Sequence, residues 1–373
     1  MSDEPSRDLG EALQAAYPEL SDIATAAGAQ PVYVVGGAVR DLLLGRGRSD
    51  IDLVVVGDAA ALAAELGAEV VEYERFATVK AQIDGHEVDI ATARAEGYRH
   101  PGALPEVMPA SAIEIDLSRR DFTINAMAVP LRGEPKLIDP HQGRVDLEAG
   151  LLRVLHRRSF VDDPTRALRA ARYAARFGFR LNPETEALLR ATDLSTVSAD
   201  RHRAELLRLG AEPDAVRGFE LLAEWGLAEP RPGGVGLAAQ VAALLSTPPW
   251  EGIAPRDRAV LAAALGPPAK EEELAAKRPA SPSEAVQLAR GRDPVELVLA
   301  RALGAEWLDR YLEEWCSVGL EIDGGDLIAA GLPEGPALGR GLAEALRRKL
   351  DGEIAGREQE LEAALEAARE SAA

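Results

Sequence analysis

The chain has 373 residues, of which 47% are hydrophobic and 28% charged, a composition that excludes a disordered or collagen-like polymer and leaves room for two or three domains. It contains no apolar run long enough for a membrane span, and the acidic start MSDEPSRDLG lacks the basic region of a signal peptide, so we expect a cytoplasmic protein with no membrane partner. The formal net charge of −20 opposes binding to nucleic-acid phosphates except where basic residues gather, as in residues 151–210, which hold twelve arginines against seven acidic residues.

The first 150 residues are predicted to form an α/β unit that begins with one polar helix in the first 30 residues. Residues 31–56 predict a strand, a glycine-rich turn, a short helix and a strand, because the apolar runs PVYVV and IDLVVV flank GGAVRDLLLG. The Gly- and Pro-rich segment from Gly97 to Ala110 predicts a long mobile loop. We expect further strands at 69–75, 77–83 and 87–92, and a helix-plus-strand unit at 113–150.

Beyond Leu151 the hydrophobic pattern becomes helical. The segment DDPTRALRAARYAARFGF opens with Asp163 and Pro164, a helix cap followed by proline at the first helical position, and ends near Gly178. More helices are predicted at 183–191, 200–209 and 215–226. The stretch from Gly339 to the end is long and acidic, and its apolar residues share one face: Leu342, Leu346, Leu350 and Ile354.

Two aspartates in the run SDIDLVVV are the strongest local indication of chemistry. Alternate side chains of a strand share a face, so Asp50 and Asp52 lie on one side, about 6–7 Å apart, while Ile51 points into the core. Neighbouring carboxylates repel unless a cation lies between them, and Mg²⁺ accepts one or two carboxylates together with water and phosphate oxygens. An isolated pair of this kind is more often an exposed strand face, so its context decides.

That context is a glycine turn between a strand and a helix. In GGAVRD, which spans residues 36–41, the glycines leave room for a triphosphate to approach backbone N–H groups at the helix start. Arg40 adds a permanent positive charge with two parallel donors. The turn and the aspartate pair together predict a metal–triphosphate site.

A third motif, RRDFTINAMA, places Arg119, Arg120 and Asp121 before an apolar segment, where Asp121 is either a binding residue or a helix cap and Arg119 is a possible surface charge. The ordered series GGAVRD, SDIDLVVV, RRDFTINAMA and DDPTRALRAARYAARFGF resembles the motifs of the class II tRNA nucleotidyltransferase and bacterial poly(A) polymerase family. The likeness is strong over residues 31–210. A weaker likeness covers the C-terminal segment that begins at Ile322, and residues 230–320 show none.

The resemblance implies an α+β fold: a nucleotidyltransferase head of the polymerase-β type, with a mixed sheet and helices, followed by an all-α neck, body and tail. It implies that Asp50 and Asp52 bind two Mg²⁺ ions, one activating an RNA 3′-hydroxyl and the other holding the triphosphate. Asp89, in HEVDIATAR, is either a third carboxylate of this site or a solvated residue on a strand face. The family motifs also imply four nucleotide contacts: Gly37 and Arg40 at the triphosphate, Arg120 near the nucleotide and Asp121 near the ribose.

In the same family an acidic residue and an arginine one helical turn apart read the Watson–Crick edge of the incoming base. The matching pair here is Asp163 and Arg166, with Arg169 and Arg172 assisting nucleotide binding. Cytosine and adenine each present an amino donor beside a ring-nitrogen acceptor, which a carboxylate and an arginine complement, whereas uracil and guanine present the reverse polarity. The family usually has Glu where this chain has Asp162. The alternative is that Asp163 is a plain helix cap beside a solvated arginine face.

These inferences predict a nucleotidyltransferase head at 1–150, a helical neck that recognises the base at 151–215, and a body and tail at 216–373 that bind tRNA. The expected reaction is template-independent addition of C, C and A to the tRNA 3′ end from CTP and ATP, with Mg²⁺ as cofactor. The alternatives are addition of only CC or only the final A, a poly(A) polymerase, or an RNA-binding protein without catalysis, which the intact Asp50, Asp52 and Arg40 oppose. The sequence sets neither this choice nor the oligomeric state.

Overall fold

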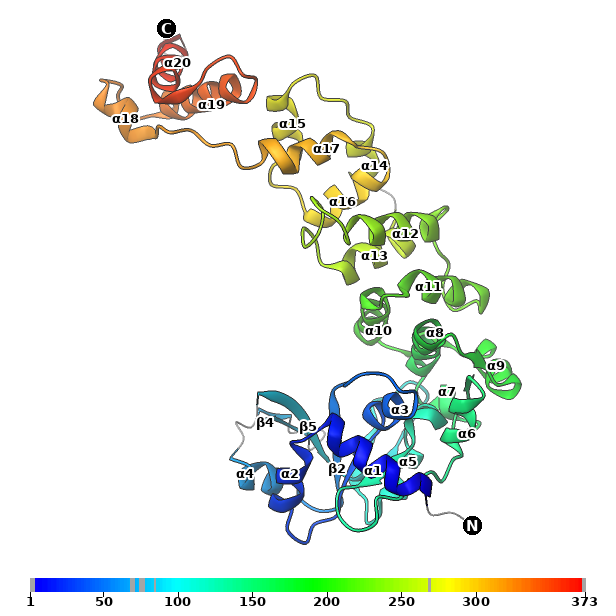
Figure 1. Cartoon of the computed structure of the whole chain (residues 1–373). Helices are drawn as coiled ribbons and strands as arrows, with labels where there is room; N and C mark the ends of the chain where they lie inside the picture. The colour runs from blue at the N-terminus through cyan, green and yellow to red at the C-terminus, as the bar shows by residue number, and fades with distance from the viewer. Residues whose placement is uncertain (1–3, 68–70, 74–77, 84, 268–269, 371–373) are drawn as a thin grey trace. The chain divides into compact units, whose positions relative to one another are not determined.

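The computed structural model describes residues 4–67, 71–73, 78–83, 85–267 and 270–370. The chain divides into two compact units, Met1–Ala228 and Glu229–Ala373. The first unit contains a mixed sheet with helices around it, and the described part of the second unit is helical (Figure 1).

A six-stranded sheet is the framework of the first unit. Its described strands lie in the order β3-β4-β5-β2-β1-β8, with β2 and β5 parallel and the other neighbours antiparallel. Strand β2 is central, and Asp52 is the one polar residue among its buried apolar side chains. The strands are β1 (Val32–Val35), β2 (Ile51–Val55), β3 (Val71–Tyr73), β4 (Thr78–Ile83), β5 (His86–Thr92) and β8 (Ala128–Pro130).

Short helices pack against this sheet. Val35 and Val54 of the sheet form a core with Ile113 and Leu117 of one helix, α5. Helix α4 was not expected from the sequence, although Asp58 caps it by accepting hydrogen bonds from two backbone N–H groups of its first turn. The helices between the strands are α3 (Gly37–Leu43), α4 (Ala59–Glu65), α5 (Ile113–Ser118), the 3₁₀ helix η1 (Thr123–Asn125) and α6 (Gly143–Glu148).

The N-terminal segment holds two helices, so the expectation of one helix is wrong. Helix α1 spans Glu4–Ala16 and α2 spans Leu20–Ala26, with Pro18 between them. Proline has no backbone N–H and disfavours helical geometry in the residue before it, so one helix cannot run through this point.

The segment expected to be a long loop belongs in part to a β-hairpin. Strands β6 (Arg94–Gly97) and β7 (Glu106–Pro109) pair antiparallel, and residues 98–105 link them. The loop prediction is wrong for Glu106–Pro109, because Pro105 precedes that strand and Pro109 ends it. At those two positions a missing backbone N–H interrupts little of the ladder.

The helices predicted after residue 151 are confirmed. The arginine-rich helix α8 (Thr165–Phe177) ends at Gly178, whose φ of 68° suits glycine. Two short strands, β9 (Leu151–Leu152) and β10 (Arg180–Leu181), pair in parallel beside it. The other elements of this part are α7 (Ser159–Asp162), α9 (Pro183–Arg190), η2 (Leu194–Thr196), α10 (Ala199–Ala211) and α11 (Ala215–Glu224).

The second unit ends in two packed helices, α19 (Pro336–Leu350) and α20 (Gly356–Glu370), and Ile354 lies in the link between them. Among the described residues, no helix combines the length and apolar character that a bilayer span requires. The preceding elements are α12 (Gly234–Leu244), α13 (Arg256–Leu265), α14 (Lys270–Ala275), α15 (Pro282–Ala289), α16 (Pro294–Ala302), α17 (Trp307–Arg310), the π-helix η3 (Tyr311–Trp315) and α18 (Gly324–Ala329).

The α19–α20 contact predicts opposite effects for two glycines of α19. A Cβ at Gly341 would lie 2.4 Å from the Ala364 carbonyl oxygen, so Gly341→Ala should destabilise the protein by about 1–3 kcal/mol. At Gly339, which is exposed, a Cβ meets nothing within 4 Å, so Gly339→Ala should stabilise it by about 0.5–1 kcal/mol. Denaturant unfolding measures both, and equal effects would contradict this packing.

Candidate functional site

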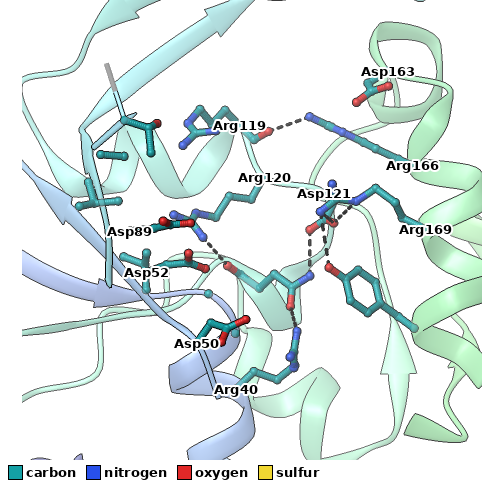
Figure 2. Close-up of a pocket in the computed structure, with 18 of the residues that line it drawn as sticks. Arg40, Asp50, Asp52, Asp89, Arg119, Arg120, Asp121, Asp163, Arg166 and Arg169 are labelled. Carbon is teal, nitrogen blue, oxygen red and sulfur yellow. Dashed lines mark hydrogen bonds and ion pairs between the residues drawn. The ribbon is translucent and has the colours of Figure 1, made fainter. Parts of the chain in front are cut away.

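A cavity of about 680 Å³ in the first unit gathers the charged motifs. Eight arginines and seven carboxylates line it. In Figure 2 the aspartates of the sheet lie on one side, and Asp163, Arg166 and Arg169 lie on the other side beside α8. Asp89 lines this cavity. So does every predicted site residue: Gly37, Arg40, Asp50, Asp52, Arg120, Asp121, Asp163, Arg166, Arg169 and Arg172.

Three aspartates form the sheet side of the cavity. Asp52 of β2 lies directly opposite Asp89 of β5 in the parallel register, so both side chains share one face. Asp50 is exposed and directly precedes β2. Lys80, opposite Asp89 on β4, places its Nζ 3.3 Å from Asp89 Oδ1. Asp89 is therefore beside the aspartate pair and has a cation for a neighbour.

The crowding is electrostatically unfavourable for Asp52. Burial raises the pKa of its carboxyl group above the ordinary value, Arg120 and Arg40 oppose that rise, and Asp89 and Asp50 add to it. Among the described residues, no group of three or more His, Cys, Asp or Glu is arranged to hold a metal ion alone. Mg²⁺ needs only one or two carboxylates when phosphate oxygens and water complete its shell. The aspartates therefore fit Mg²⁺ bound together with a phosphate ligand.

The glycine turn allows close contact between three motifs. Gly36 has a φ of 65°, and a Cβ there would lie 2.7 Å from Arg120 Nη1 and 3.8 Å from Asp52 Oδ2. A larger residue would therefore meet Arg120 as well as an unfavourable backbone conformation. This is why the chain can bring the turn, the arginine and the aspartate together.

Arg40 is held more firmly than its motif predicts. It is 4% exposed, and its Nε and Nη2 donate to both Asp41 carboxylate oxygens at 2.8 and 3.0 Å. Its Nη1 donates to Asn125 Oδ1 at 2.6 Å, and its guanidinium lies 4.6 Å from the Phe177 ring centre. Asp41 therefore neutralises much of the positive charge that the sequence assigned to the triphosphate.

Asp116, which the sequence analysis missed, organises the two arginines of RRDFTINAMA. It is fully buried and accepts from Arg119 Nε at 2.9 Å and from Arg120 Nη2 at 3.1 Å. Arg119 also donates to Glu96 of the hairpin, so it is not a free surface charge. The signal in the sequence is an aspartate three and four residues before the arginines, which places all three on one helix face.

Asp121 forms a buried ion pair and does not cap a helix. Its Oδ2 accepts from Arg169 Nε at 2.9 Å and Nη2 at 2.6 Å, and its Oδ1 accepts from Asn125 Nδ2 and from the Phe122 N–H. Although burial raises the pKa of Asp121, Arg169 and these donors lower it more, so it lies well below the ordinary value. Asp121 therefore stays ionised and holds Arg169 in place.

Asp163 caps α8 and also lines the cavity. Its Oδ1 accepts from the Thr165 N–H at 3.1 Å and from Thr165 Oγ1 at 2.6 Å. Arg166 is 5% exposed and donates to Ser159 Oγ and to the Arg119 carbonyl oxygen, both at 2.7 Å. Asp163 thus accepts from the N–H of the first residue of α8, as a capping residue does, but Arg166 is buried and is not part of a solvated face. The second oxygen of Asp163 takes no part in these bonds to Thr165.

Arg172 lies in the second half of α8. Its Nη1 is 3.5 Å from Glu212 Oε1, and its guanidinium lies 4.7 Å from the Tyr173 ring centre. Asn125 and Arg201, which bond the charged motifs, were also missed. The first lies inside a quoted motif, whereas nothing in the sequence relates Arg201 to Asp163, 38 residues away.

Comparison with known proteins gives matches along the chain. A family model described as the poly A polymerase head domain matches residues 32–153, and one described as a probable RNA and SrmB-binding site of polymerase A matches residues 178–232. An A-adding tRNA nucleotidyltransferase of Halalkalibacterium halodurans is 45% identical over 204 residues, or 51% of this chain and 48% of that protein. The chain thus spans about half the length of this relative.

Other known proteins resemble this chain over nearly its whole length, including the following two. A CC-adding tRNA nucleotidyltransferase of Deinococcus radiodurans is 35% identical over 359 residues, which cover 91% of each protein. The solved Thermotoga maritima CCA-adding enzyme, complexed with tRNA, is 29% identical, with a TM-score of 0.71 over 96% of this chain and 98% of that chain. The structural likeness confirms the expected α+β fold, with a polymerase-β-type head before the helical parts.

The crowding at Asp52 predicts a stability change that can be measured without any substrate. Asp52→Asn removes a partly buried charge beside two other carboxylates, so it should raise Tm at pH 7 by about 2–4 °C, the shift that ~1 kcal/mol causes in a unit of this size. Asp50→Asn, at the exposed position, should change Tm by less than about 1 °C. A destabilised Asp52→Asn would contradict the account of crowding.

Proposed function

The chain belongs to the class II tRNA nucleotidyltransferase family, and on that premise we propose that it adds C, C and A to the 3′ end of tRNA, using CTP and ATP and releasing pyrophosphate. The observation that carries the proposal is the single cavity that joins the aspartates of the sheet to Asp163 and Arg166. The full-length likeness to a CCA-adding enzyme complexed with tRNA supports the proposed RNA substrate.

Asp50 and Asp52 are the proposed metal ligands. The chemistry supplied by two bound Mg²⁺ ions is neutralisation of the triphosphate charge and activation of the RNA 3′-hydroxyl. Asp52 lies on the central strand β2, and Asp50 is the residue directly before that strand. Asp89 shares the face of Asp52 and is proposed as the third carboxylate, with Lys80 offsetting its charge.

The arginines on the cavity wall are proposed to hold the nucleotide. Arg120, anchored by Asp116, faces Gly36 and Asp52, where the phosphates would approach. Gly37 lines the cavity at the same turn and is proposed to let the phosphates approach the backbone at the start of α3. Arg40 is proposed to act mainly by fixing Asn125 and the turn, because Asp41 offsets its charge. Arg169 and Arg172 line the remaining wall, where Asp121 is proposed to lie near the ribose.

Asp163 and Arg166 are proposed to select the base. The outer carboxylate oxygen of Asp163 accepts the amino group of cytosine or adenine, and Arg166 donates to the neighbouring ring nitrogen. Both side chains have restricted freedom, since Thr165 holds the carboxylate, and Ser159 and the Arg119 carbonyl hold the guanidinium. A uracil would bring a carbonyl oxygen against the carboxylate, so UTP is rejected by repulsion.

Residues 151–215 are proposed to act as the neck that recognises the base, and the helical residues 216–373 to bind tRNA as body and tail. The family-model match over residues 178–232, whose description names RNA binding, supports an RNA contact that begins within the neck. The second candidate function is addition of CC alone. It is favoured by the similarity to the Deinococcus radiodurans CC-adding enzyme, which covers 91% of the chain.

One experiment tests the function and separates the candidates. Purified protein is incubated with Mg²⁺, CTP and ATP and with three tRNAs that end at the discriminator base, at C, or at CC. Complete CCA addition predicts extension of all three, whereas CC addition predicts that the third tRNA stays unextended. Repeated ATP incorporation into an unrelated RNA would instead indicate a poly(A) polymerase, and no incorporation at all would overturn the proposal.

The metal-ligand assignment predicts loss of catalysis without loss of RNA binding. Asp50→Ala and Asp52→Ala should each lower kcat by at least about a hundredfold, because transition-state charge would lose its metal support. The Kd for tRNA, measured by filter binding, should change by less than about threefold, because most of the RNA contacts are assigned elsewhere. Near-normal kcat in either variant would refute the assignment.

Base selection by Asp163 predicts a change of specificity on substitution by asparagine. Asn can still accept from Thr165 through its carbonyl oxygen, so capping and Tm should be nearly unchanged. Its NH₂ group would then face the base and donate to uracil while opposing the cytosine amino group. The ratio of kcat/KM for CTP over UTP should fall by about tenfold or more. An unchanged ratio at unchanged Tm would leave Asp163 as a cap only.

A further inference from the structure

We propose that Arg201 is a positioning residue for base selection, and that it ties Asp163 to the link of the β6–β7 hairpin. The inference rests on the proposed function, in which Asp163 accepts the amino group of the incoming base. Arg201 lines no part of the cavity, and its effect is exerted through the carboxylate that does.

The observation is a bridge made by one guanidinium group. Arg201 extends from the first turn of α10, where its Nη2 donates to Asp163 Oδ1 at 2.9 Å and its Nη1 donates to the Gly102 carbonyl oxygen at 2.8 Å. Gly102 lies in the link between β6 and β7, and Asp163 directly follows α7, two residues before α8 begins. One side chain therefore connects three segments that are distant in sequence.

Because of this bridge, the two carboxylate oxygens of Asp163 have different hydrogen-bond partners. Oδ1 accepts from three donors: the Thr165 N–H, Thr165 Oγ1 and Arg201 Nη2. A carboxylate oxygen with three donors is fully engaged, so rotation of the group would break all three bonds. Oδ2 is consequently the oxygen left for a base. Without Arg201 the carboxylate keeps only its two bonds to Thr165 and turns more freely.

The link between β6 and β7 is held in place at Gly102 by contacts with two other segments. Gly102 has a φ of 71°, and a Cβ there would lie 2.5 Å from the Thr196 carbonyl oxygen. Its N–H donates to the Val161 carbonyl oxygen at 3.3 Å. Because Gly102 contacts the segments before α8 and α10, a movement of the link changes the position of the Arg201 guanidinium and with it the Asp163 carboxylate.

A positioning role for Arg201 and a purely structural role predict different effects of a substitution. Arg201 is 25% exposed and Asp163 is 20% exposed, so their ion pair lies in a partly hydrated setting where such pairs contribute little to stability. A residue that only stabilised the fold would alter Tm and affect all nucleotides alike. A residue that orients the base-reading oxygen alters the preference between CTP and UTP.

The test compares Arg201→Gln with Arg203→Gln in the full-length protein. Arg203 lies on the same helix and is exposed, and within the described part of the chain its side chain forms no hydrogen bond or ion pair. We expect the ratio of kcat/KM for CTP over UTP to fall about tenfold in Arg201→Gln and to stay within about twofold of the wild type in Arg203→Gln. The Tm of both variants should stay within about 2 °C of the wild type.

An unchanged CTP-over-UTP ratio in Arg201→Gln would overturn the inference, as would an equal fall in the control variant. A wild-type protein that adds neither CTP nor ATP to tRNA would instead refute the proposed function. The two failures are therefore distinguishable in one series of assays.

The link to the hairpin is tested with Gly102→Ala, alone and combined with Arg201→Gln. The alanine Cβ would meet Thr196, so the link must shift while every side chain of the cavity is retained. Because both substitutions break one bridge, we expect Gly102→Ala to lower the ratio too, and the double variant to be no worse than Arg201→Gln. A normal ratio in Gly102→Ala, or losses that multiply in the double variant, would overturn the coupling.

Discussion

A continuous chain of charged and amide groups crosses the cavity, and the arrangement of the site depends on it. Arg169 of α8 binds Asp121, Asp121 accepts from Asn125, Asn125 accepts from Arg40, and Arg40 binds Asp41 of α3. Figure 2 labels three of its members, Arg40, Asp121 and Arg169. Removing one partner of a buried pair leaves an uncompensated charge, which costs about 3–5 kcal/mol. The chain therefore holds the glycine turn and the arginine helix in one geometry.

Pairing within the protein also explains how a chain of net charge −20 can hold a site for anions. Eight arginines and seven carboxylates line the cavity, so its walls are nearly balanced although the chain is not. Most of these arginines are oriented by a carboxylate, as Arg120 is by Asp116. At the sheet, by contrast, three aspartates lie together, and Asp89 and Asp50 add to the rise in the pKa of Asp52 that burial causes. The proposed metal ion and triphosphate would neutralise part of each other's charge at these aspartates.

Asp163 shows why structural and functional interpretations of one residue need not compete. Its two carboxylate oxygens have different surroundings, because the first turn of α8 and Arg201 occupy Oδ1. The bonds to Oδ1 fix the orientation of the carboxylate group, and they therefore also fix the direction of Oδ2. The same division is available wherever a capping aspartate borders a cavity, since a cap requires only one of the two oxygens.

The sequence by itself determined the strands and helices whose periodicity is local, together with the charged motifs, all of which the fold brings to one cavity. Asp50 and Asp52 were found because alternation along a strand is a local rule. Tertiary structure decided what each motif residue contacts. Arg40 is neutralised, Asp121 holds Arg169 rather than a helix end, Asp116 orients two arginines, and Arg201 reaches Asp163 across 38 residues. The β6–β7 hairpin belongs to the same group, because its strands pair across a link rich in glycine and proline. Asp41 and Asp116 are near their arginines in the sequence, so a local pattern could have indicated those pairs. The contacts of Asp121 and Arg201 join residues that no local pattern relates, and only the folded chain, which places both partners within hydrogen-bond distance, could show them.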